Sequence, residues 1–124
     1  EQEAFKKDIP HIQDILSIKE LSNYIIIITG SYASGKSTKK SDLDLVVIDP
    51  DDKDPVTLNK LIENKTLIWQ PSIHLYVFRQ KDFTEMLVSE DESYGKEIFK
   101  NRIILKGASR YYELVREAMR RGMK

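Results

Sequence analysis

The apolar residues of this 124-residue chain fall into short runs separated by polar turns. Two of these runs, residues 24–28 and 43–48, are rich in Ile and Val and are bounded by turn residues, so both are predicted to be buried strands. Segments rich in apolar residues at 73–78 and 103–105 predict two further strands. Strands interspersed with helical stretches indicate a mixed α/β fold in which helices flank a small sheet.

Helices are predicted between and beside these strands. Residues 1–23 are expected to be helical, beginning near Asp8-Ile9-Pro10, because proline suits a first helical turn. Asp54-Pro55 is expected to cap a short helix with Val56, Leu58, Leu61 and Ile62 on or near its inner face. The other expected helices begin at Lys81 or Asp82, run from Ser93 to about Asn101, and cover 108–121. A chain of this length forms one domain, here 1–124.

The polar segment between the first two strands matches a phosphate-binding pattern. Residues 30–37, Gly-Ser-Tyr-Ala-Ser-Gly-Lys-Ser, fit the P-loop pattern G-x-x-x-x-G-K-[ST]. A P-loop must open a helix whose N-terminal amides hold the phosphates. Only residues 38–42 separate this pattern from the next strand, and a βαβ crossover needs about a dozen residues or more. We therefore reject the P-loop interpretation and expect the two strands to be antiparallel neighbours.

An antiparallel pair places the end of the first strand beside the start of the second. Asp42 and Asp44 are two residues apart, so their side chains are expected on one face of the sheet. Two converging carboxylates repel each other unless a cation lies between them, and Mg²⁺ often takes one or two carboxylates and completes its shell with water and substrate phosphates. Gly30 permits close backbone approach, and Ser31 offers a hydroxyl and an N–H to a phosphate. The segment predicts a site for a metal-bound nucleoside triphosphate.

Gly30-Ser31, Gly35 and then Ser41-Asp42-Leu43-Asp44 before an apolar run resemble the signature of the polymerase-β-like nucleotidyltransferases, and most closely the small minimal nucleotidyltransferases that act as antitoxins. The resemblance implies the nucleotidyltransferase fold, two Mg²⁺ ions held by Asp42 and Asp44, and triphosphate contacts from Gly30 and Ser31, to which we add Ser41. It also implies transfer of a nucleoside monophosphate from a triphosphate such as ATP to a hydroxyl. The implied partner, which could carry the acceptor, is a helical HEPN-type protein.

The chain departs from this family at one position. Family members carry a third carboxylate on the strand beside the Asp-x-Asp strand, and the matching position here is His74. Histidine is a poor Mg²⁺ ligand, although it is a residue type that can act as a general base near neutral pH. His74 could therefore replace the base, mark a weakened nucleotide-binding or partner-binding module, or be a structural histidine. We retain His74 as a candidate catalytic residue.

Composition limits the other function classes. Twenty Lys and Arg residues balance twenty Asp and Glu residues, so no global field favours nucleic acid or a membrane surface, although a nucleic acid is still a conceivable acceptor. The chain has no cysteine and no apolar run near the roughly 20 residues of a membrane span, so we expect a cytoplasmic protein. Basic residues in the 36–40 turn and at the end of the last helix are interpreted as solvated charges and dipole-complementing charges, with phosphate or RNA contact as the alternative.

Overall fold

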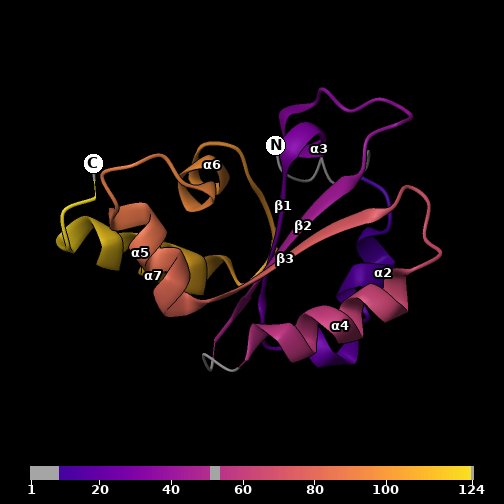
Figure 1. The fold of residues 1–124 in the computed structure, drawn as a ribbon, viewed down its shortest axis with the longest axis horizontal. Coiled ribbons are helices and arrows are strands. Elements are labelled where there is room, and N and C mark those ends of the chain that lie inside the picture. Colours follow the sequence, from indigo (N-terminus) through magenta and orange to yellow (C-terminus); the bar gives the residue numbers. More distant parts are fainter. Residues whose placement is uncertain (1–8, 51–53, 124) are drawn as a thin grey trace.

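Four strands form a single mixed sheet in the computed structural model, which describes residues 9–50 and 54–123 (Figure 1). The strand order is β3-β2-β1-β4, with β1 at Ile25–Thr29, β2 at Leu43–Asp49, β3 at Ile73–Arg79 and β4 at Ile103–Lys106. β1 is antiparallel to both β2 and β4, whereas β2 and β3 are parallel. The predicted antiparallel pairing of the first two strands is confirmed, and so is the mixed α/β fold.

Helices cover both faces of the sheet (Figure 1). One face packs against α2 (Ile12–Leu16), the 3-10 helix η1 (Lys19–Leu21) and α4 (Pro55–Thr66). The other face packs against α5 (Gln80–Val88), α6 (Tyr94–Lys100) and α7 (Ala108–Arg120). A short helix, α3 (Gly30–Ser34), follows β1 directly, and no helix follows it between Ser37 and Leu43. The segment lacks the P-loop helix, as predicted, but its first residues form a helical turn where the sequence predicts only a loop.

The alternation of side chains along β1 and β2 divides the core into two halves. Ile25 and Ile27 pack on the α5–α7 side together with Val46 and Ile48. Their neighbours pack on the α2–α4 side: Ile26, Ile28, Leu45 and Val47. All eight side chains are at most 1 % exposed. Truncating a buried isoleucine of this kind to alanine costs about 2–5 kcal/mol, so these two strands anchor the domain.

Two predicted helix starts are confirmed by their caps. The Asp54 carboxylate accepts a hydrogen bond from the Val56 N–H (3.0 Å), and the Ser93 hydroxyl accepts one from the Lys96 N–H (3.3 Å). Each side chain satisfies an amide that the first helical turn leaves without a partner. Gly107, which closes β4, adopts a left-handed conformation with φ +81°, so the break before α7 lies where predicted.

Several boundaries differ from the prediction. The single helix expected over 1–23 is wrong in its described part, because α2 and η1 are separated by Ser17 and an extended Ile18; residues 1–8, with the expected start at Asp8, lie outside the described residues. α5 begins at Gln80, not at residue 81 or 82. On α4, Ile62 is buried, but Val56 and Leu61 are 56 % and 37 % exposed. The inner face of α4 follows the i, i+4 series through Leu58, Ile62 and Thr66, which turns Val56 and Leu61 outward.

No helix within the described ranges is long and apolar enough to cross a membrane.

Candidate functional site

The turn after β1 lies directly against the second aspartate. Thr29, the last residue of β1, pairs with Asp44 on β2, and Gly30 follows with a left-handed φ of +71°. A Cβ at position 30 would lie 2.0 Å from Asp44 Oδ2, far inside van der Waals contact. The backbone therefore reaches the carboxylate only because residue 30 is glycine. This close approach was expected from the sequence.

The two aspartates are held by the start of the β2–β3 pairing. The Leu43 N–H donates to the Ser72 carbonyl (2.9 Å), and the Ser72 hydroxyl donates to Asp42 Oδ1 (2.5 Å). Asp42 is exposed, whereas the Asp44 side chain is only 24 % exposed. One carboxylate thus faces solvent at the strand entrance and the other lies deeper, against the turn that follows β1.

The surroundings of Asp44 disfavour its negative charge. Burial raises the pKa of the Asp44 carboxyl above its ordinary value; the adjacent His74 partly opposes this shift, and the Asp42 carboxylate adds to it. A carboxylate in this position gains stability when a cation replaces the lost hydration. The electrostatics of the pair therefore favour a cation at the Asp44 end of β2.

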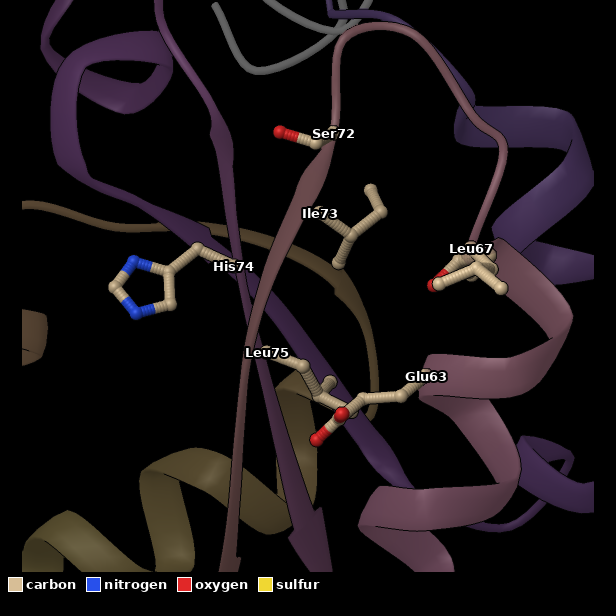
Figure 2. Close-up of a pocket in the computed structure, with 7 residues that line it drawn as sticks. Glu63, Leu67, Ser72, Ile73, His74 and Leu75 are labelled. Carbon is tan, nitrogen blue, oxygen red and sulfur yellow. The ribbon is translucent and has the colours of Figure 1, made fainter.

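His74 lies beside Asp44, as the predicted strand pairing requires. The two residues are register partners in the parallel β2–β3 pair, and His74 Nδ1 is 3.2 Å from Asp44 Oδ1. Figure 2 shows that the His74 ring projects from β3 on the side opposite to Ile73, whose side chain points toward α4. The hollow of about 390 Å³ in that view is lined by residues of α4 and β3, among them Glu63, Ile73 and His74. His74 thus lies on the neighbouring strand beside Asp44, where the family resemblance leads us to expect a third carboxylate.

The remaining predicted residues lie around the same turn. Ser31 is half-buried in the first turn of α3. Thr29, which precedes α3, makes no side-chain cap, because its hydroxyl donates to the Asn101 carbonyl (2.6 Å) instead. Ser41 is further along the loop, where its hydroxyl accepts from the Thr38 N–H (2.9 Å) and closes the turn. Ser41 thus has a structural contact of its own.

The donor set fits Mg²⁺ bound through few protein ligands. The described residues hold no group of three or more His, Asp or Glu side chains arranged to bind a metal. Two hard carboxylates, Asp42 and Asp44, are nevertheless close enough for Asp42 to affect the charge of Asp44. Mg²⁺ is commonly bound by one or two carboxylates together with substrate phosphates, so the site suits a metal that arrives with its nucleotide.

Sequence reasoning missed the contribution of α6. The Asn101 side chain donates to the Gly30 carbonyl (2.9 Å) across 71 positions of sequence. A cleft of about 200 Å³ adjoins this bond, lined by strand residues and by residues of α6 and its C-terminal end: Thr29, Gly30, Asp44, Tyr76, Tyr94, Glu97 and Asn101. The spacing of Tyr94, Glu97 and Asn101 at i, i+3 and i+7 places them on one helical face, which is the only signal the sequence offered.

One of the comparisons with known proteins identifies the family of this chain. No curated protein and no solved structure matches the chain. A family model described as a nucleotidyltransferase domain matches residues 10–105, which includes the Gly-Ser turn, both aspartates, β3 and α6. This match covers well over half of the chain, and the chain belongs to the nucleotidyltransferase domain family.

Proposed function

We propose that this domain transfers a nucleoside monophosphate from a Mg²⁺-bound nucleoside triphosphate to a hydroxyl group of a partner molecule. The observation that carries the proposal is the convergence of Asp42, Asp44 and the Gly30 backbone at one end of the β1–β2 pair. The two carboxylates would act as anionic ligands beside a turn that only glycine can form. Membership of the nucleotidyltransferase family supports the same reaction class.

Asp42 and Asp44 would hold up to two Mg²⁺ ions, which when bound supply positive charge to the phosphates and align the reacting oxygens. Gly30 lets the chain pass close to the phosphates, and Ser31 offers its hydroxyl and its N–H, in a first helical turn that lacks a side-chain cap. Ser41 supports the site by closing the 38–41 turn.

In the proposed reaction, the acceptor hydroxyl oxygen bonds to the α-phosphorus, and the bond from that phosphorus to the oxygen bridging the β-phosphorus breaks. Pyrophosphate leaves with that oxygen. The hydroxyl proton passes to a base, for which His74 is positioned beside Asp44, or to water. The acceptor comes from outside the domain; the resemblance to minimal nucleotidyltransferases supports a helical HEPN-type protein as that partner.

A second candidate function is a nucleotide-binding or partner-binding module of antitoxin type with little transfer activity. The observation that favours it is the imidazole in place of a third carboxylate, 3.2 Å from Asp44. An imidazole adds no negative charge to a Mg²⁺ site, so metal activation of the acceptor would be weaker.

Calorimetric titration of ATP with Mg²⁺ and with a chelator tests the proposal. Binding that requires Mg²⁺ and is weakened in the Asp44→Asn variant supports the site. Equal affinity with and without the metal, or no binding in either condition, contradicts it. Release of pyrophosphate in the presence of the partner then separates the transferase from the binding module.

A further inference from the structure

The cleft beside Asp44 has room for only part of a nucleotide. It measures about 200 Å³, whereas pockets that enclose a whole drug-sized ligand usually span about 300–1,000 Å³. It shares Gly30 and Asp44 with the proposed metal and phosphate site, and from there it extends between β3 and α6. A nucleotide whose phosphates lie at Gly30 would therefore place another of its parts in this cleft.

The charge at the α6 end of the cleft disfavours phosphates there. None of its seven lining residues, all of them in the described ranges, is lysine or arginine, and two of them, Asp44 and Glu97, are acidic. The metal-bound phosphates would lie at the Gly30 and Asp44 end, and Glu97 would repel a triphosphate tail from the α6 end of the cleft. The nucleoside end of the substrate is the part that this environment admits.

Aromatic rings form one wall of the cleft. The rings of Tyr76 and Tyr94 are in contact, with centroids 4.3 Å apart and planes inclined by 32°. Phe78 backs this pair, with its centroid 6.4 Å from Tyr76 and 6.1 Å from Tyr94. Aromatic surfaces of this kind stabilise nucleobases of every sequence by stacking, so they favour a base without choosing among bases.

Glu97 is the residue of the cleft that could discriminate among bases. It lies on α6 one helical turn from Tyr94 and is exposed, and it has no ion-pair partner among the residues that the structure describes. An ionised carboxylate only accepts hydrogen bonds. The exocyclic amino groups of adenine and cytosine donate hydrogen bonds, whereas the carbonyl oxygens at the same positions of hypoxanthine and uracil only accept them.

We propose that the cleft between β3 and α6 binds the base of the nucleoside triphosphate and that Glu97 selects bases bearing an exocyclic amino group. The inference rests on the proposed function, because it needs the phosphates at Gly30 and Ser31. Tyr76 and Tyr94 supply affinity that is independent of the base, and Glu97 supplies the discrimination.

Two matched nucleotide pairs test the inference. ATP and inosine triphosphate differ in an amino group against a carbonyl at one ring carbon, with the adjacent ring nitrogen an acceptor in ATP and an N–H donor in inosine triphosphate, and CTP and UTP differ in the same way. We expect the wild-type protein with Mg²⁺ to bind the amino member of each pair about tenfold more tightly. In the Glu97→Gln variant this ratio should fall toward one, since an amide can both donate and accept.

The ratio of the two affinities within a nucleotide pair separates the effect of a hydrogen bond to Glu97 from the effect of its charge. Removing the Glu97 charge should strengthen binding of all four triphosphates, because each is an anion, but this effect cancels in the ratio. The Glu85→Gln variant removes another exposed charge, on α5 and outside the cleft, and should leave the ratio unchanged. The Tyr94→Ala variant should bind all four nucleotides about tenfold more weakly, with the affinity ratio within each pair unchanged. The Tyr94→Phe variant should bind them nearly as the wild type does.

Each contrary outcome has a distinct meaning. If all four nucleotides bind equally with Mg²⁺, or if the Glu97→Gln variant keeps the wild-type ratio, the inference is wrong while the proposed function stands. The Glu97→Gln change could alter the affinity ratio of ATP to 2′-deoxy-ATP and leave the ratio of ATP to inosine triphosphate unchanged. That result would show that Glu97 contacts the ribose and would overturn base selection. If no triphosphate binds with Mg²⁺, both the proposed function and the inference fail.

Discussion

Gly30 and Asp44 lie so close that no side chain fits between them: a Cβ at position 30 would be 2.0 Å from Asp44 Oδ2. The contact joins the end of β1 to the start of β2, directly after the register pair that Thr29 forms with Asp44. Any residue other than glycine must displace the carboxylate or the turn. The position of Asp44, the proposed metal ligand, thus depends on the absence of a side chain at residue 30.

The Gly30→Ala variant should lose Mg²⁺-dependent nucleotide affinity by about 10–100-fold, the usual cost of disturbing a group that orients a metal ligand. Gly35→Ala is the matched control, because Gly35 also has a left-handed φ (+78°) but a Cβ added there would meet no other atom within 4 Å. Both variants should lose about 1–2 kcal/mol of unfolding free energy from backbone strain, and Gly30→Ala should lose more because its Cβ overlaps Asp44. Calorimetry and denaturant unfolding check the two effects separately; equal loss of affinity in both variants would contradict the proposed geometry.

The Asp44→Asn variant should be more stable than the wild type when no metal is present. Burial raises the pKa of Asp44 above its ordinary value of 3.8, so the folded state holds this proton more tightly than the unfolded state. Wild-type stability therefore falls as pH rises from 3.8 through the raised pKa, and the variant has no such proton to lose. Solvent access keeps the gain small, up to about 3 °C in Tm at neutral pH.

Thermal unfolding in chelator across this pH range measures the difference. The two proteins should have similar Tm values below pH 3.8 and diverge above it. Asp42→Asn is the control: it weakens the hydrogen bond from Ser72 and should not stabilise the protein at any pH. An Asp44→Asn variant that is less stable than the wild type at neutral pH would show that the carboxylate is well accommodated without a cation.

The strands and the carboxylate face could be predicted from sequence because they depend on local periodicity. The period-2 pattern of β1, β2 and β3 placed Asp44 and His74 correctly, and the short connection fixed the antiparallel pairing. Predictions from local sequence patterns were wrong where contacts between residues distant in sequence determine the structure. The residues before β1 form two short helices because Ile15 and Leu21 are buried against the sheet, and α4 turns Val56 outward for the same reason.

The part of the candidate site on α6 could not be predicted in this way. Asn101 reaches the Gly30 carbonyl across 71 positions, and no periodicity in either segment indicates the other. The pattern of Gly30–Ser34 is typical of a turn because glycine and serine are poor helix formers, yet it forms α3 between β1 and the loop. Tertiary packing, which the sequence shows only indirectly, therefore sets the wall of the site opposite the aspartates.

The Asn101→Ala variant should loosen the turn after β1. Its side chain is a donor to the Gly30 carbonyl, and removing a partner from a partly buried group costs about 1–3 kcal/mol. We expect this loss in the unfolding free energy together with weaker Mg²⁺-dependent nucleotide binding. Asn64→Ala on the exposed side of α4 is the control and should change stability by no more than about 0.5 kcal/mol. Unchanged nucleotide affinity in Asn101→Ala would mean that the turn holds its conformation without α6.

The His74→Asp variant should raise transfer activity in Mg²⁺. Aspartate at this register position would add a hard anionic ligand beside Asp44, where the imidazole adds no negative charge and little Mg²⁺ affinity. The gain could approach the factor of about 10²–10⁴ that a positioned base contributes. Single-turnover transfer to the partner, with nucleotide binding measured in parallel, gives the result; His74→Asn, which adds no charge, is the matched control.

A fall in activity for both His74 variants, with nucleotide binding unchanged, would instead identify the imidazole as the working base. That outcome requires the proton of the acceptor hydroxyl to pass to His74, whose Nδ1 is within 3.2 Å of Asp44 and would be oriented by it. If both variants transfer and bind as the wild type does and differ from it only in Tm, His74 has a structural role. The two carboxylates would then be the whole of the catalytic machinery that this domain provides, and activation of the acceptor would fall to the partner.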